Sequence, residues 1–250
     1  MLAFTGAARP RSAGALRAAA EQLGCDIAAI EAVIDVEAAG FGFDHAGRPK
    51  MLFEPHIFWQ NLSGAERDAA AQEDLAYPAW KPDYPPDSYP RLYKALQINE
   101  DAALNSCSWG LPQILGENHM PAGYTTPQTM VAAFCDGEDE QIAAMARFIC
   151  AKGLNVYLQT QNWAAFARGY NGPAYARNAY DQKLAAAYAR HAGNADSDVT
   201  PAAPGPVASS PTAPTGNAPS ALQSLIAAVL AIVIRTLGQA FMRWLRSSKR

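Results

Sequence analysis

The spacing of hydrophobic residues predicts a mainly α-helical domain over residues 1–192. Alanine, leucine and isoleucine recur there every three or four positions, the period of a helix face, and no alternating strand pattern runs longer than a few residues. The predicted helices are 16–23, 26–39, one opening at the capping-box pattern Ser63-Gly64-Ala65-Glu66, 91–99, 109–115, one opening at Thr126-Pro127, 137–152, 163–169 and 175–190. Residues 50–53 are the strand candidate near the front, and proline-rich 77–90 predicts an extended loop.

One carboxyl group interrupts this hydrophobic pattern. Ile30, Ile34, Glu37 and Phe41 recur at steps of four, three and four, which places Glu37 on the buried stripe of its helix. Burial raises the pKa of a glutamic acid above its usual value of about 4.3, so that it stays protonated near neutral pH and can act as a general acid. The alternative is an ordinary solvated glutamate near the helix end that Gly40 terminates.

Glycoside hydrolysis usually needs a second carboxylate besides the acid, and two residues are candidates for it. Asp44 and Glu54 follow Glu37 by 7 and 17 residues, in a segment that must fold back near the helix end. Glu54 is preferred because it stands among large apolar residues, with Asp44 as runner-up. The alternative for Glu54 is a structural ion pair with a nearby basic side chain.

Two further polar clusters are candidates for binding a sugar. In residues 105–119, Ser108 and Gln113 could bond hydroxyl and acetamido groups while Trp109 packs on a ring face, although an aromatic residue here could equally belong to the core. Tyr170 and Asn171 could line the opposite wall of a cleft, or 170–173 could be a plain turn between helices.

Composition limits the other classes of function. The net charge is −3 and the basic residues cluster only at the C-terminal end, which argues against nucleic acid as a partner. Four cysteines, Cys25, Cys107, Cys135 and Cys150, include no closely spaced pair, which argues against a structural zinc site and leaves disulfides or buried free thiols open. The first residues contain no recognisable secretory signal peptide.

The chain after residue 192 has a different composition. Residues 193–220 are rich in proline, alanine and serine, as in a linker, and 221–250 form a hydrophobic and cationic segment that predicts a helix. A transmembrane span needs about 20 apolar residues, and Arg235 interrupts this run. A membrane-inserted helix, a helix lying on the membrane surface and an oligomerisation helix therefore all remain open.

Four segments in order resemble the N-acetylmuramidase domain of phage endolysins: 36–43, 47–58, 108–116 with Asn118 and His119, and 170–173. The resemblance covers roughly residues 10–190, and four ordered motifs are far more specific than any one of them. It implies a lysozyme-like helical domain, distantly similar to goose-type lysozymes and lytic transglycosylases, that cuts the bond between N-acetylmuramic acid and N-acetylglucosamine in peptidoglycan.

The resemblance also implies roles for individual residues. Glu37 matches the catalytic acid, and Ser108, Gln113, Tyr170 and Asn171 match motifs of the wider group. Together with Trp109 and His119 they make up the predicted substrate-binding residues. Pro112 departs from the motif of the wider group. No cofactor or metal is implied, and we expect a monomer that acts on glycan strands in the periplasm or cell wall, associated with the membrane through its C-terminal helix.

Three alternatives remain open at this level. A lytic transglycosylase needs only one acid and would leave 1,6-anhydro ends on its products. A peptidoglycan-binding module, or a membrane-active protein whose tail is the effector, would need no catalysis at all. A phage lysin and a cell-wall effector delivered to competitors cannot be separated.

Overall fold

The computed structural model describes residues 4–82 and 84–195 of the chain. The described residues up to Gly193 form one compact unit. Its helices are α1 (Ala13–Leu23), α2 (Ile27–Ala38), α3 (Pro55–Asn61), α4 (Gly64–Gln72), α5 (Tyr89–Ile98), α6 (Glu100–Asn105), α7 (Pro127–Asp136), α8 (Glu138–Ala151), α9 (Asn155–Gln159), α10 (Trp163–Asn171) and α11 (Tyr180–Ala195). Two 3₁₀ helices, η1 (Gly116–Asn118) and η2 (Tyr175–Asn178), complete the helical content. The predicted mainly helical class is confirmed.

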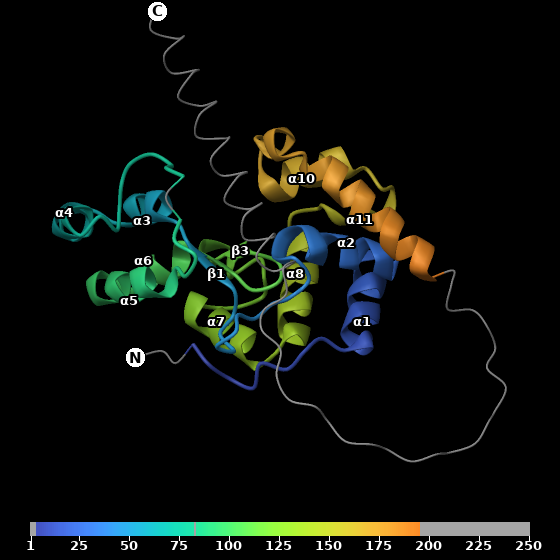
Figure 1. Ribbon diagram of the computed structural model, residues 1–250, viewed down its shortest axis with the longest axis horizontal. Coiled ribbons are helices and arrows are strands. Elements are labelled where there is room, and N and C mark those ends of the chain that lie inside the picture. Colours follow the sequence, from blue (N-terminus) through green and yellow to red (C-terminus); the bar gives the residue numbers. More distant parts are fainter. Residues whose placement is uncertain (1–3, 83, 196–250) are drawn as a thin grey trace, which may run out of the picture. The chain divides into compact units, whose positions relative to one another are not determined.

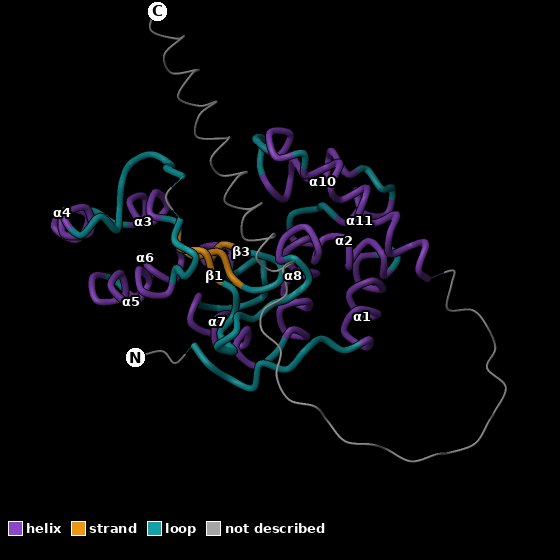
Figure 2. The backbone as a smooth tube through the Cα atoms, in the orientation of Figure 1, coloured by secondary structure: helices purple, strands orange, loops and turns teal. Residues whose placement is uncertain are grey.

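The strands form one small antiparallel sheet in the middle of the unit (Figure 2). β1 (Met51–Phe53), β2 (Cys107–Trp109) and β3 (Ile114–Leu115) lie in that order, with Met51 opposite Trp109 and Ser108 opposite Leu115. β1 lies where the sequence predicts a strand, and it joins two stretches of chain that are far apart in sequence. The sheet therefore fixes the segment around residue 110 against the segment around residue 50.

Two hydrophobic clusters build the core, one for each group of helices in Figure 1. The first lies around the sheet and α3 to α7 and centres on Phe53, Trp109 and Phe134. The second joins α1, α2 and α8 to α11, through residues such as Ile30, Ile34 and Ile149. Tyr170 is half-buried and packs against both clusters, so α10 reaches the junction between them.

The chain before α1 is part of this core. Phe4 is 3% exposed and its ring stacks on Trp109, with ring centroids 5.8 Å apart. Farther on, the Arg9 backbone bridges to Gly137, and the Arg11 side chain pairs with Glu138 at 3.3 Å. This segment thus holds the sheet at one end and the start of α8 at the other.

Local sequence explains several helix starts. Asp26 caps α2 by accepting the backbone N–H of Ala29, and Thr126 caps α7 in a reciprocal capping box with Thr129, followed by Pro127 in the first turn. The predicted capping box at Ser63 is wrong, because α4 begins after Ser63 but the serine side chain makes no capping bond. The start of α4 was therefore predicted correctly, but the serine cap that was expected to begin it is absent.

The predicted helix over 109–115 is also wrong, because these residues form the hairpin between β2 and β3. Gly110 and Gln113 have φ angles of 65° and 47°, which a right-handed helix does not allow. Pairing of β2 with β1 overrides the local helical pattern. By contrast, α10 runs two residues past its predicted end, so Tyr170 and Asn171 lie on its last turn rather than in a loop.

The predicted linker and C-terminal helix fall outside the described residues, apart from the end of α11. That helix ends at Ala195, so its last residues belong to the stretch predicted as linker. Within residues 4–82 and 84–195, none of the helices has the length and apolar character needed to cross a bilayer.

Candidate active site

Glu37 lies on the last turn of α2, where the chain leaves the helix. Ala39 adopts the left-handed conformation, with φ of 51°, and its N–H bonds the carbonyl oxygen of Asp35 at 3.1 Å. This turn ends the helix at Ala38 and leaves Glu37 half-buried one residue before that end. The predicted position of the carboxyl group, at a helix-to-loop boundary, is the one observed.

The surroundings of Glu37 favour its protonated form. Burial raises the pKa of Glu37 from 4.5 to about 7, although the hydrogen bond from Asn171 and the positive charge of Lys183 act to lower it. Asn171 Nδ2 donates to Glu37 Oε1 at 2.8 Å. A carboxyl group with a pKa near 7 can both hold and release a proton at neutral pH, as a general acid must.

Two tyrosines, Tyr170 and Tyr180, also lie near Glu37. Tyr170 packs face to face with Phe166, and its hydroxyl donates to the carbonyl oxygen of Pro112 in the β2–β3 hairpin at 2.8 Å. Tyr180 stands at the start of α11. Burial, with a further contribution from the charge of Glu37, raises the pKa of both phenols, to about 12 for Tyr180. The motifs at 37, 110–113 and 170–171 therefore meet in space.

The remaining predicted sugar-binding residues lie along the hairpin and just after it. Ser108 is half-buried in the middle of β2, and Gln113 Nε2 donates to the carbonyl oxygen of Gly110 in its own turn at 2.8 Å. His119 follows η1, with Nδ1 3.0 Å from the carbonyl oxygen of Gly116. Among the described residues, no hydrogen bond connects these three side chains to Glu37, so their part in binding stays a prediction.

The expected role of Trp109 in sugar binding is wrong. Its side chain is 0% exposed, its ring stacks on Phe4, and Nε1 donates to the carbonyl oxygen of Leu104 at 3.1 Å. No ring face is open to a ligand, because both the apolar body and the polar tip of the indole are satisfied inside the core. Trp109 is a core residue, the alternative that the sequence left open.

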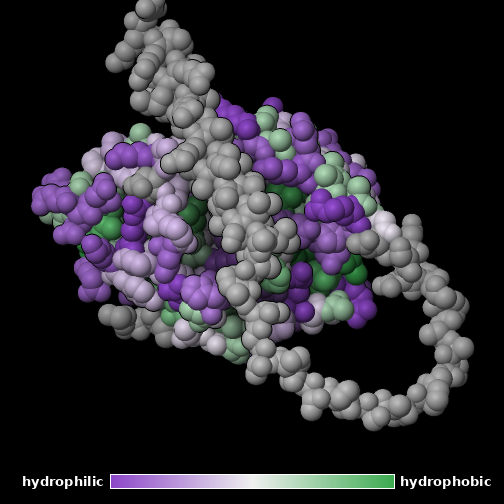
Figure 3. Space-filling view, viewed as in Figure 1, coloured by the Kyte–Doolittle hydropathy of each residue, from purple (hydrophilic) through white to green (hydrophobic). Residues whose placement is uncertain are grey.

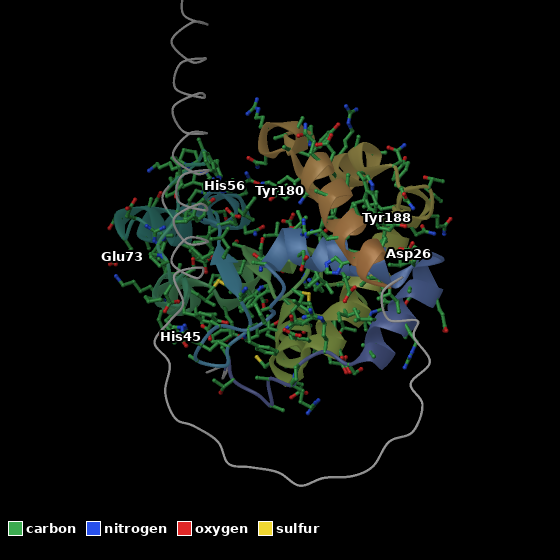
Figure 4. All side chains as sticks on the ribbon, turned by 45° about the vertical axis from the view of Figure 1, so that its right-hand side comes forward. Asp26, His45, His56, Glu73, Tyr180 and Tyr188 are labelled. Carbon is green, nitrogen blue, oxygen red and sulfur yellow. The ribbon has the colours of Figure 1, made fainter. Side chains whose placement is uncertain are left out.

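Glu54 stands at the other end of β1 and immediately precedes α3. The hydroxyl of Tyr84, from the proline-rich loop, donates a hydrogen bond to Glu54 Oε2, and His56 Nδ1 lies 3.6 Å from the same oxygen. Burial raises the pKa of Glu54, and the bond from Tyr84 partly opposes that rise. In Figure 4, His56 and Tyr180 lie on facing sides of the two helical groups.

Asp44 has a different environment. Burial acts to raise the pKa of Asp44, but hydrogen bonds from the Arg48 side chain, the Arg48 backbone and the Ala46 backbone outweigh it and lower the pKa. Arg48 Nε donates to Asp44 at 2.7 Å, and the same guanidinium reaches Asp87 at 3.2 Å. The carboxylate of Asp44 is therefore engaged in holding its own loop, and Glu54 is the stronger candidate.

The helices that surround Glu37 are joined by polar contacts between α2 and α11. Tyr188 donates to Asp26, the cap of α2, at 2.7 Å (Figure 4). One turn further along α11, His191 lies 3.2 Å from Glu31 and 2.8 Å from Asp35. These contacts dock α11 along α2 and so fix Tyr180 and Lys183 near Glu37.

Two features of the site were not predicted. No sequence pattern marked Tyr84 as a site residue, apart from its place in a proline-rich loop. Phe41 was expected on the buried stripe but is 68% exposed, because α2 ends at Ala38 and the chain turns outward. Within the described part of the chain, no group of three His, Cys, Asp or Glu side chains is arranged to hold a metal ion, and all four cysteines are free.

A helical domain with a small antiparallel sheet and a half-buried carboxylic acid at a helix end fits the lysozyme-like class of glycan-cleaving enzymes. A sequence model of N-acetylmuramidases matches residues 26–192, and the chain belongs to this family of peptidoglycan-degrading enzymes. The crystal structure of a Burkholderia AP3 phage endolysin is similar, with 39% sequence identity and a TM-score of 0.67 over 74% of this chain and 73% of that one. No curated protein matches the chain.

Proposed function

We propose that the chain hydrolyses the glycosidic bond between N-acetylmuramic acid and N-acetylglucosamine in peptidoglycan, with Glu37 as the general acid. The observation that carries the proposal is the environment of Glu37, a carboxyl group whose pKa burial raises to about 7 and whose Oε1 is held by Asn171. In this role Glu37 protonates the glycosidic oxygen as the bond to the leaving sugar breaks.

Glu54 is the proposed second carboxylate. Lys50 lies next to the end of α2, because its Nζ donates to the carbonyl oxygen of Ala38, and β1 then runs from there to Glu54. An inverting mechanism would need the two carboxyl groups about 6.5–9.5 Å apart, with a water molecule between them. Glu54 would order that water or stabilise positive charge on the sugar ring.

The similarity to a phage endolysin supports the wider proposal that the chain is itself an endolysin acting on the cell wall. The family supports a peptidoglycan substrate, and the site supports acid catalysis on it. No step of this chemistry calls for a cofactor.

Mass spectrometry of the muropeptides released from purified peptidoglycan by the full chain tests the proposal. Reducing muramic acid ends that are lost in Glu37→Gln would establish a hydrolase that depends on Glu37, and 1,6-anhydro ends would make it a lytic transglycosylase. Glu21→Gln, on the exposed surface of α1, is the matched control and should release the same products as the parent. Unchanged release by Glu37→Gln would overturn the proposal.

A further inference from the structure

Phe41 is a large aromatic side chain that is open to solvent just after the helix that carries Glu37. It is 68% exposed and follows Glu37 by four residues, just beyond the end of α2. Most of the described surface on the face in Figure 3 is hydrophilic, with hydrophobic residues in separate patches. A single exposed aromatic residue needs no explanation by itself, so the question is what holds it there.

The backbone on both sides of Phe41 is fixed by one ion pair. Arg11 Nη1 donates to the carbonyl oxygen of Gly40 at 2.7 Å, and the backbone N–H of Gly42 donates to Glu138 Oε1 at 2.7 Å. Arg11 and Glu138 also pair with each other at 3.3 Å, and Glu138 is only 5% exposed. A buried charge is expensive unless it is paired and hydrogen-bonded, and here those bonds go to the residues before and after Phe41.

The loop has little room to move. A Cβ atom at Gly42 would meet Gln141 Oε1 at 2.3 Å, and this buried amide is itself held by bonds to Leu111 and Phe134. The backbone N–H of Lys50 also bonds the carbonyl oxygen of Gly42 at 2.8 Å. The loop is therefore packed against α8 and tied to Lys50, just before β1, while the Phe41 side chain stays 68% exposed.

The ammonium group of Lys50 lies over the Phe41 ring. Its Nζ lies 5.7 Å from the centroid of the Phe41 ring and donates to the carbonyl oxygen of Ala38, on the last turn of α2. A cation near a ring face is attracted by the negative charge of that face, which favours one orientation of the ring. A ring ordered before binding loses little conformational entropy when a ligand covers it.

We propose that Phe41 is a sugar-binding platform on which a pyranose ring of the glycan strand stacks next to Glu37. The C–H groups on the face of a pyranose carry partial positive charge and pack well on the electron-rich face of an aromatic ring. The platform would hold a sugar of the strand beside the bond that Glu37 protonates. The inference rests on the proposed function, because the position of Phe41 has this meaning only if Glu37 is the acid.

Binding can be measured without catalysis in the Glu37→Gln background of the full chain. In cosedimentation with purified peptidoglycan sacculi, Phe41→Ala should weaken binding about three- to tenfold, the loss expected for one aromatic stacking contact. Phe41→Trp should bind like the parent, and Phe41→Leu should bind like Phe41→Ala, because leucine keeps the apolar volume but has no ring face. The matched control is Met120→Ala, since Met120 is also large, apolar and 72% exposed.

In the active chain, Phe41→Ala should lower kcat/KM on peptidoglycan by a similar factor, and Phe41→Trp should restore it. The melting temperature should stay unchanged in both variants, because the side chain is exposed. Equal binding by Phe41→Ala and its parent, full binding by Phe41→Leu, or a fall in melting temperature that matches the loss of binding would each overturn the inference. These outcomes are distinct from a failure of the proposed function. That failure would appear as full activity in Glu37→Gln with Phe41 unchanged.

Discussion

The side-chain amide of Asn171 donates a hydrogen bond to Glu37 at 2.8 Å, although 134 residues separate the two in the chain. The bond joins the ends of two helices, α2 and α10, and lies where the two hydrophobic clusters meet at Tyr170. It fixes one oxygen of the carboxyl group. The position of the proposed acid is therefore set by tertiary structure and not only by its own helix.

The activity should fall as the pH rises through about 7. The proposed acid works only while it is protonated, and burial raises the pKa of Glu37 to about 7. We therefore expect the alkaline side of the profile of kcat against pH to bend near this value. A profile that stays flat to about pH 9 would contradict Glu37 as the acid.

Removal of the Asn171 amide should move that bend to higher pH. The hydrogen bond from Asn171 lowers the pKa of Glu37, so Asn171→Ala should raise the pKa further while the maximal rate falls, because the carboxyl group is no longer held in place. The pH dependence of kcat measures both effects. Adding Asn171→Ala to Glu37→Gln should cost little extra activity, and a large additional loss would mean that Asn171 acts independently of Glu37.

Glu37 should also make the stability of the fold depend on pH. Its pKa is about 7 in the folded chain and about 4.5 when exposed, so its contribution to stability is fully present below pH 4.5 and is lost as the pH rises through 7. The loss amounts to at most about 3 kcal/mol. In denaturant unfolding, Glu37→Gln should therefore gain stability over the parent between about pH 4 and pH 8, whereas Glu21→Gln should not.

Tyr84 should influence the second carboxylate through its hydroxyl group. Burial raises the pKa of Glu54 and the bond from Tyr84 opposes this, so Tyr84→Phe should raise the pKa of Glu54 further. If Glu54 acts in its ionised form, the acidic side of the kcat profile then shifts to higher pH. Tyr93→Phe is the control, because Tyr93 is 40% exposed and lies on α5. Identical profiles for the two variants would argue against Glu54 in this role.

Two glycines should respond in opposite ways to alanine. A Cβ atom at Gly116 would meet the backbone oxygen of Leu104 at 2.0 Å, so Gly116→Ala should destabilise the fold by about 2 kcal/mol or more. At Gly14, in α1, the nearest atom is Ser12 Oγ at 3.5 Å, and alanine there should stabilise by up to about 1 kcal/mol. Denaturant unfolding measures both, and a stable Gly116→Ala would mean that η1 can shift away from α6.

The sequence predicted those features that depend on neighbouring residues. Thr126 caps α7 by a bond within one turn and Pro127 occupies its first position, so the signal for this helix start is local and was correct. The polar position of Glu37 within an apolar stripe likewise marks an unusual carboxyl group. The pairing of Glu37 with Asn171 joins distant residues, and only the family resemblance brought the two motifs together.

The errors have the opposite cause. The helical pattern at 109–115 was overridden by pairing with β1, an interaction that no local pattern contains. Phe41 was placed inside because the period of α2 was continued past Ala39, although the left-handed turn there reverses the direction of the next side chain. The expected role of Trp109 failed because Phe4, far away in sequence, covers its ring.

The packing of Phe4 and Arg11 sets the practical limits of any shortened form of the enzyme. A fragment trimmed to the family match at 26–192 would uncover the indole of Trp109 and leave the buried carboxylate of Glu138 without its arginine. Such a fragment should aggregate or lose the loop that carries Phe41. If the fragment were inactive, the cause would be the loss of the packing by Phe4 and Arg11, and not a failure of the proposed acid catalysis by Glu37.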